Sequence, residues 1–302
     1  MRRAFVLAVI ALAGCEQTDS KAPQSTRTSA TAPIKVRSGV ANMRIVATST
    51  LPANPKPSTV EEYCSGYAIA KPQTAGGRLA ARKGWLVTSE TKLGKYDAVN
   101  FVGALEGSTS ATCLHVNGNI GFFDGSKVLA IAYWKRSADN PLTDGGDGIE
   151  DSLGVAAQID PQRIRLYWGL PAPPFADVAL RDGISVERIA PKDPACGGAA
   201  EVPNVFGEKI ADARKKLIAF GWRPQPPPAD DPMTGIFEGG DVPEVEACSG
   251  TGYGFCAYNY KHRKGFGLRV VSIGEEYGVY GWTPYCSGAW QDRFAGDGHY
   301  SM

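Results

Sequence analysis

Short runs of branched and aromatic residues recur between residues 84 and 189, and glycine, asparagine or aspartate separates each run from the next. This spacing is typical of strands joined by turns. Only residues 60–67 and 75–83 have a pattern compatible with helical turns. Residues 59–190 are therefore predicted to form a β-rich domain, arranged as an antiparallel sheet, a sandwich or a partial barrel. Its expected strands are 84–88, 98–102, 111–116, 120–123, 128–134, 155–159, 163–168 and 184–189.

The pattern changes after residue 190. Residues 191–201 mix proline, glycine and charge, which is typical of a linker. In residues 208–220 apolar side chains stand three or four positions apart, as on one face of a helix, and Gly221 ends the pattern. Two of these apolar residues, Ala213 and Leu217, are expected to face a sheet.

The fold class predicted from these patterns is α+β, and mainly β. Three strand-like runs follow the helix, so residues 202–290 are predicted to form a small domain with a helix on a three-stranded antiparallel sheet. Residues 291–302 are left as a tail. The expected strands of this domain are 254–260, 267–273 and 278–282.

Composition narrows the class of protein. The 302 residues include 36 glycines and 21 prolines, above average usage, which favours turns and short strands over long helices. An apolar share of 43% suffices for a buried core. No run reaches the roughly 18 apolar residues of a membrane-spanning helix. A formal net charge of +1 provides no global field that would attract nucleic acid, so no nucleic-acid partner is expected.

The first residues have the pattern of a bacterial export signal. Met1-Arg2-Arg3 is basic, and the apolar run 4–14 is too short to span a membrane. The run ends in Leu12-Ala13-Gly14-Cys15, which resembles the lipobox of bacterial lipoproteins. The resemblance implies that residues 1–14 are removed as a signal peptide and that Cys15 carries acyl chains such as palmitate. The alternative is an ordinary signal peptide with a coincidental cysteine.

Two further expectations concern the segment after the lipobox. By analogy with lipoproteins, Glu16 in place of aspartate argues against retention in the inner membrane and implies an outer-membrane location facing the periplasm. Stable anchoring needs more than one acyl chain, and the resemblance implies two or three. Residues 15–58, rich in Ser, Thr, Ala and Pro, are predicted to be a disordered tether. Residues 43–48 are the exception, with the pattern of an edge strand.

Residues 202–222 resemble the opening of a PASTA domain. The matching positions are Val202-Pro203-Asn204, Gly207, Ala213, Leu217 and Gly221. PASTA domains are small units of one helix and three strands, and several bind cell-wall muropeptides, so the resemblance implies an envelope-binding module over residues 202–290. The proline-rich stretch and the paired cysteines after Trp222 are not PASTA features. The alternative is that any strand-entry turn followed by an amphipathic helix has this pattern.

Cysteine pairing is the most specific chemistry in the sequence. With Cys15 lipidated, six of the seven cysteines remain, and an even number in an exported chain indicates three disulfides, for which fifteen connectivities exist. Cys248 and Cys256 flank a glycine-rich segment and are expected to pair across a hairpin. The alternative joins Cys256 to Cys286. If the hairpin pair forms, the simplest arrangement of the rest joins Cys64 to Cys113 and Cys196 to Cys286.

No other motif predicts a catalytic or cofactor site. The cysteine and histidine spacings do not match a zinc site, and the sequence has no Gly-x-Ser-x-Gly elbow and no phosphate loop. No metal, cofactor or catalytic residue is therefore assigned. Several features have a functional alternative, although a structural role is the simpler interpretation of each. His115 could be a base, the acidic loop 139–151 could hold Ca²⁺, and the basic tip 261–264 could contact lipid phosphates or anionic glycans. The aromatic residues Trp282, Tyr285, Trp290 and Tyr300 could form a platform on which a glycan stacks.

The sequence thus predicts a non-catalytic lipoprotein of the cell envelope, anchored through Cys15, whose C-terminal module binds a ligand. That ligand would be peptidoglycan or an envelope protein. Two alternatives stay open: an enzyme of an unrecognised β-rich type, and a lipoprotein with a structural or assembly role. Acidic and basic groups clustered in a deep pocket would favour the enzyme, whereas a shallow aromatic or strand-edge surface would favour binding.

Overall fold

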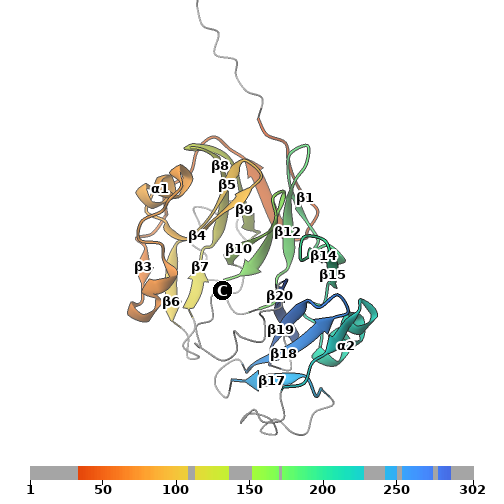
Figure 1. Ribbon diagram of the computed structural model, residues 1–302. Helices are drawn as coiled ribbons and strands as arrows, with labels where there is room; N and C mark the ends of the chain where they lie inside the picture. The colour runs from red at the N-terminus through yellow and green to blue at the C-terminus, as the bar shows by residue number, and fades with distance from the viewer. Residues whose placement is uncertain are drawn as a thin grey trace, which may run out of the picture. The chain divides into compact units, whose positions relative to one another are not determined.

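Strands far outnumber helices in the part of the chain that the computed structural model describes (Figure 1). This confirms the predicted mainly-β class. No helix in the described segments is long and apolar enough to cross a membrane. The described residues are 33–107, 113–135, 152–169, 172–227, 242–249, 254–274 and 278–286.

Two five-stranded sheets contain most of the strands expected between residues 59 and 190. Neighbouring strands are antiparallel, except that β1 pairs with β13 in parallel. Sheet I has the order β2 (Met43–Ala47), β9 (Lys127–Trp134), β8 (Asn119–Asp124), β5 (Tyr96–Val102) and β4 (Leu86–Leu93). Sheet II has the order β1 (Val36–Ser38), β13 (Ile184–Glu187), β12 (Ala176–Leu180), β11 (Arg163–Trp168) and β10 (Leu153–Asp160).

One hydrophobic core joins sheets I and II. Ile120 and Phe122 of β8 and Ile164 and Leu166 of β11 belong to the same fully buried cluster. Side chains alternate between the two faces of a strand, so the residues between these point away from the shared core. The two sheets therefore pack as a sandwich, and sheet II keeps an outer face on which β11 can present polar side chains.

A second core covers the other face of sheet I. The helix α1 (Ala75–Arg82) packs there, and its Ala80 clusters with Phe101 and Phe123 of the sheet. The helix lies so close that a Cβ on Gly76 would stand 2.5 Å from Cγ of Phe123, so only glycine fits at this position. Because both faces of sheet I are covered at its centre, the inner strands β5, β8 and β9 are mostly buried, whereas the edge strands β2 and β4 keep exposed or polar positions.

A small third sheet lies beside the short 3-10 helix η1 (Glu62–Tyr67). It joins β3 (Thr59–Val60), β6 (Ala104–Gly107) and β7 (Cys113–Val116). The disulfide between Cys64 and Cys113 links η1 to β7. These two cysteines form a small buried cluster with Val102 and Leu105, so the disulfide is part of a local core.

The C-terminal segments contain a helix and an antiparallel sheet, sheet III. Ala213 and Leu217 of α2 (Ile210–Ala219) are fully buried in one cluster with Trp222 and Tyr260 of the sheet, as expected. Sheet III contains the three expected strands, and two more strands pair with β18. One is β17, the other arm of the expected Cys248–Cys256 hairpin, and the other is β16, which was not expected. Its strands are β16 (Trp222–Pro224), β17 (Val245–Cys248), β18 (Phe255–His262), β19 (Gly267–Ile273) and β20 (Gly278–Tyr285).

The predicted disordered tether, 15–58, contains β1, so the prediction is wrong there. β2 lies at the edge of sheet I, which confirms the edge strand expected at residues 43–48. β1 pairs with β13, and β2 pairs with β9. Met43 and Ile45 of β2 are buried in the core between sheets I and II. Two alternating apolar residues suffice to bury one face of an edge strand, although the composition of the whole segment is polar.

The predicted linker, 191–201, is a β-hairpin and not an irregular connection. β14 (Lys192–Ala195) pairs with β15 (Ala200–Pro203). Cys196, Gly197 and Gly198 in the turn all have positive φ, so the glycines serve a tight turn. The hairpin also buries Asp193, whose side chain is 1% exposed.

Candidate functional site

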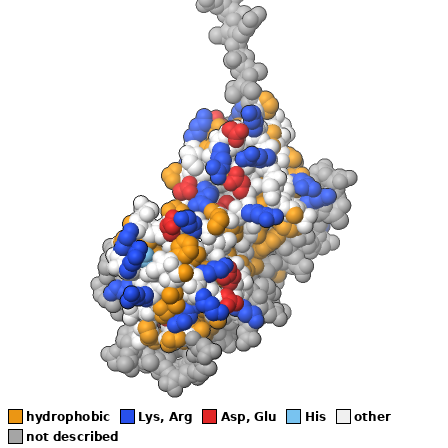
Figure 2. All heavy atoms as spheres, turned by 90° about the vertical axis from the view of Figure 1, so that its right-hand side faces the viewer, with side chains coloured by type: hydrophobic (Ala, Val, Ile, Leu, Met, Phe, Trp, Pro, Cys, Tyr) orange, Lys and Arg blue, Asp and Glu red, His pale blue; other side chains and the backbone are white. Residues whose placement is uncertain are grey.

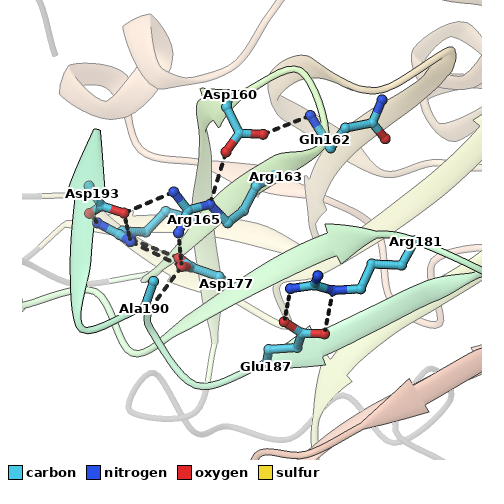
Figure 3. A network of polar contacts seen from close by, with 9 residues as sticks. All are labelled: Asp160, Gln162, Arg163, Arg165, Asp177, Arg181, Glu187, Ala190 and Asp193. Carbon is cyan, nitrogen blue, oxygen red and sulfur yellow. Dashed lines mark hydrogen bonds and ion pairs between the residues drawn. The ribbon is translucent and has the colours of Figure 1, made fainter. Parts of the chain in front are cut away.

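Four charged residues form a buried network on the outer face of sheet II, which we call the Arg–Asp network: Arg163, Arg165, Asp177 and Asp193 (Figure 3). The two arginines stand at alternate positions of β11 and so share one face. Asp177 of β12 lies directly opposite Arg165 in the antiparallel register. Asp193 comes from the hairpin β14–β15, which continues into the helix and strands of the C-terminal region.

Arg165 is held by two carboxylates at once. Its Nε and Nη2 donate to Asp177 Oδ1 and Oδ2 at 2.8 and 3.0 Å. Its Nη1 and Nη2 donate to Asp193 Oδ2 and Oδ1 at 2.6 and 3.2 Å. Its guanidinium Cζ lies 4.9 Å from the centroid of the Phe206 ring, a cation–π contact. The side chain is 1% exposed, so nearly all of its charge is satisfied by protein groups.

Arg163 completes the network from its rim. It contacts Asp177 at 3.3 Å and Asp193 at 3.0 Å, and its Nε donates to Asp160 at 3.1 Å. Two arginines thus face two buried aspartates, with Asp160 at the edge. The charges balance inside the network, which leaves no unpaired buried ion.

The electrostatics of the network favour a structural role. Burial alone would lower the pKa of Arg165, but the hydrogen bonds and charges of Asp177 and Asp193 outweigh burial and raise it above its ordinary value. Arginine in such a site exchanges no proton near neutral pH. Bidentate arginine–carboxylate pairs are geometrically specific, so the network is suited to hold β14 against sheet II.

An open groove lies beside the network, with a volume of about 450 Å³. Its charged lining residues are Arg163, Asp177, Arg181, Glu187 and Arg188. Glu187 accepts a hydrogen bond from Ser185 Oγ at 2.7 Å, and this bond, with the charges of Arg181 and Arg37, lowers the pKa of Glu187. The lowered pKa favours the ionised form of Glu187, whose charge in the groove is balanced by the neighbouring arginines.

His115 is a buried residue of β7, as the structural interpretation predicts. The residue is 5% exposed, and neither ring nitrogen has a hydrogen-bond partner among the described residues. A Cβ on Gly154 would come within 2.8 Å of its Nδ1, so the ring is tightly packed against backbone. Burial lowers the pKa of His115 to about 4. The imidazole is therefore neutral at pH 7.

The burial of His115 predicts a pH dependence of stability. The folded state keeps the imidazole neutral, whereas the unfolded chain takes up a proton below about pH 6.5, so stability should fall as the pH drops from about 6.5 to 4. The shift corresponds to about 3 kcal/mol. Urea unfolding of the native chain and of His115→Asn at pH 7, 6, 5 and 4 measures this difference. Parallel stability profiles for the two proteins would contradict it.

The other residues singled out from the sequence do not gather into one site. Trp282 is half-buried and stacks on Phe206 with 6.5 Å between ring centroids, which is core packing. Within the described segments no three His, Cys, Asp or Glu side chains group as metal ligands. The following lie outside the described residues: Cys15, the acidic loop 139–151, Trp290 and Tyr300.

The six cysteines after Cys15 form three disulfides. They join Cys64 to Cys113, Cys196 to Cys286 and Cys248 to Cys256, the same pairs that the sequence favours. Cys248 and Cys256 are direct partners in the pairing of β17 with β18, which is the expected hairpin.

The Arg–Asp network was missed in the sequence. Its one local signal is the alternation of arginine with apolar residues in Arg163-Ile164-Arg165-Leu166, which shows that one face of the strand is polar. Nothing local indicates that Asp193, 28 positions further along, supplies the second carboxylate.

Comparisons with protein-family models, with curated proteins and with solved structures found no match to this chain. The lipobox and PASTA resemblances therefore stay predictions from the sequence.

Proposed function

We propose that this chain is an exported, lipid-anchored protein of the cell envelope that binds a cell-wall or envelope ligand and catalyses no reaction. The arrangement of the cysteines is the observation that carries the proposal. Six cysteines are paired in disulfides in the described part of the chain, and the seventh, Cys15, stands at the end of the lipobox. Structural disulfides persist in oxidising compartments such as the periplasm.

The geometry of the polar groups supports binding over catalysis. The arginines and aspartates of the Arg–Asp network are paired with one another, and His115 is buried with no hydrogen-bond partner for its ring in the part of the chain that the structure describes. The groove beside the network is open, and two of the charged residues that line it, Arg181 and Glu187, are paired with each other.

The C-terminal region supports the finer proposal of a PASTA-like module. A helix whose Ala213 and Leu217 pack on β18, β19 and β20 has the layout that the resemblance implies. The two added strands and the Cys248–Cys256 disulfide depart from that layout. We assign the binding of peptidoglycan or an envelope protein to residues 202–290, which a lipid anchor at the outer membrane would hold in the periplasm.

Cys15→Ser tests the anchor. The variant should leave the membrane fraction, or accumulate as uncut precursor, and should lose incorporation of a labelled palmitate analogue, because the thiol is the acyl acceptor. Glu16→Gln keeps the cysteine and serves as the matched control, which should stay labelled and membrane-bound. Normal processing and unchanged fractionation of Cys15→Ser would refute the lipoprotein assignment.

Co-sedimentation of the chain from residue 16 onward with purified peptidoglycan tests the binding function. The chain should pellet with the peptidoglycan and should release no soluble fragments from it. Release of fragments would favour the enzyme. Absence of both binding and cross-linking to any envelope protein would favour a structural or assembly role.

A further inference from the structure

The groove beside the Arg–Asp network has a neighbour on the same face of sheet II. A second hollow, of about 370 Å³, is lined by residues 35–37 and 182–185, which include parts of β1 and the start of β13. Ser185 lines this hollow and Glu187 lines the groove, and Ser185 Oγ donates to Glu187 Oε1 at 2.7 Å. The two hollows therefore lie one after the other along β13. We call them together the β13 groove, and its charged residues outside the Arg–Asp network are Lys35, Arg37, Arg181, Asp182, Glu187 and Arg188.

The β13 groove lies on a side of the protein that a partner can reach. All of its charged residues outside the Arg–Asp network are exposed except Glu187, which is half-buried. Figure 2 faces the side on which β1, β12 and the β14–β15 hairpin lie in Figure 1. Lys and Arg side chains gather on the upper part of that face, with Asp and Glu side chains among them.

Cations outnumber carboxylates in the β13 groove. Glu187 is shared by two arginines, with Arg181 Nη2 at 3.3 Å from Oε2 and Arg37 Nη2 at 3.7 Å from Oε1 (Figure 3 shows the first pair). Arg188 and Lys35 are exposed, and neither forms an ion pair within the segments that the structure describes. The groove therefore keeps a net positive charge, which attracts an anionic ligand.

The chemistry of these cations suits oxyanions. Three of the four are arginines, whose planar guanidinium can donate two parallel hydrogen bonds to one carboxylate or phosphate. Arg181 uses Nε and Nη2 for Glu187, at 3.4 and 3.3 Å, so its Nη1 is left for a second acceptor. The whole guanidinium of Arg188 is left for a ligand in the same hollow.

Two carboxylates between the cations argue against a uniform polyanion. Glu187 stands among the arginines, and Asp182 lines the second hollow. A chain with a negative charge on every unit would place charges against both carboxylates, and like charges brought together oppose binding. A peptide in which acidic and uncharged residues alternate avoids this repulsion, and its main-chain N–H groups can donate to the carboxylates.

Apolar groups also line the hollow beside the network. Ile189, Ala190 and Pro191 contribute to its wall, and all three are half-buried. An apolar side chain of a ligand that lies there would remove this surface from water. Phosphate chains have no group of that kind, whereas peptides do. Because the two hollows follow one strand, an occupant of both must also be elongated.

From these observations we propose that the β13 groove binds an extended acidic peptide segment of a partner protein. Arg181 and Arg188 bind its carboxylates in the hollow beside the network, and Lys35 and Arg37 bind a carboxylate in the second hollow. An apolar side chain of the peptide packs on Ile189. The inference goes beyond the proposed function, which assigns ligand binding to residues 202–290, and it does not need a lipid on Cys15.

Fluorescence anisotropy with a labelled peptide tests the binding. The protein is the chain from residue 16 onward at about 0.1 M salt, and the probe is a ten-residue peptide of alternating Glu and Leu. A peptide of alternating Gln and Leu is the uncharged control and should not bind. Equal binding of the two peptides, or no binding of the acidic one, would overturn the proposal.

Arginine variants locate the site. Arg188→Gln should weaken binding of the acidic peptide about fivefold, which corresponds to about 1 kcal/mol, and the combined change of Arg181 and Arg188 to Gln about 20-fold. The matched control changes Arg82 and Lys83 to Gln, since both are exposed cations at the end of α1. It should alter binding by less than about twofold. Equal losses in the two double variants would show attraction by net charge alone and would contradict the site.

Glu187→Gln should change binding in the opposite direction. The variant removes the carboxylate that Arg37 and Arg181 share, so the acidic peptide should bind about fivefold more tightly. A residue with a merely structural role would give weaker binding or none, and that result would count against the proposal.

Polyphosphate of about the same charge as the acidic peptide identifies the class of ligand. It should bind the native chain at least about tenfold more weakly than the peptide does. If it binds as tightly, the groove takes polyanions in general and the acidic peptide is wrong. Because the chain lacks Cys15 throughout and the variants lie outside residues 202–290, failure here is distinct from failure of the proposed function.

Discussion

We expect Arg165→Met to lower the free energy of unfolding by about 3–5 kcal/mol. The change removes the guanidinium that binds Asp177 and Asp193, whose side chains are 2% and 1% exposed, and leaves both carboxylates buried with only Arg163 to balance them. Burial of an unpaired charge is among the costliest single defects in a protein. Urea unfolding followed by tryptophan fluorescence measures the loss.

Arg181→Met is the matched control for this prediction. Arg181 also contacts a carboxylate, Glu187, but its side chain is 64% exposed, so the change should cost less than about 1 kcal/mol. Replacing Arg165, Asp177 and Asp193 together by Met, Leu and Leu should recover part of the loss, because the buried carboxylates are removed and Arg163, which is 15% exposed, keeps Asp160 as its partner. A cost below about 1 kcal/mol for Arg165→Met alone would contradict the buried network.

The second large effect is expected from the disulfide between Cys196 and Cys286. Its cysteines are 90 positions apart, and the loop-entropy model gives about 4–5 kcal/mol for a ring of that size. Cys248 and Cys256 are 8 positions apart, for which the same model gives about 2–3 kcal/mol. The longer ring links the hairpin β14–β15 to the end of β20, so its loss frees far more of the unfolded chain.

The two double alanine variants test this order directly. The change of Cys196 and Cys286 should lower the free energy of unfolding by about 2 kcal/mol more than the change of Cys248 and Cys256. Both proteins are compared by urea unfolding under non-reducing conditions. An equal or reversed order would mean that native contacts, and not chain entropy, set the contribution of these disulfides.

Several features of this chain follow from local pattern alone. The strands around Ile120 and Ile164, the helix that buries Leu217, and the pairing of Cys248 with Cys256 all lie where the sequence predicts them. Each depends on side-chain periodicity or on a turn between near neighbours, and such signals need only a few adjacent residues.

One strand of sheet II, β12, was not predicted from the sequence. Two of its five residues are alanine, which is a weak strand former, so its alternation of side chains is a weak signal.

The long-range partners were decided only by the tertiary structure. Periodicity shows that one face of β11 is polar, but not that Asp193 of a supposed linker will lie over Arg165. It shows two apolar residues, Met43 and Ile45, in a polar segment, but not the open edge at β9 that accepts them. These contacts form because folding closes long loops, and the cost is offset by the apolar surface that is buried and the charges that are paired. The two partners of such a contact are far apart in the sequence, so the residues around either one do not indicate the other.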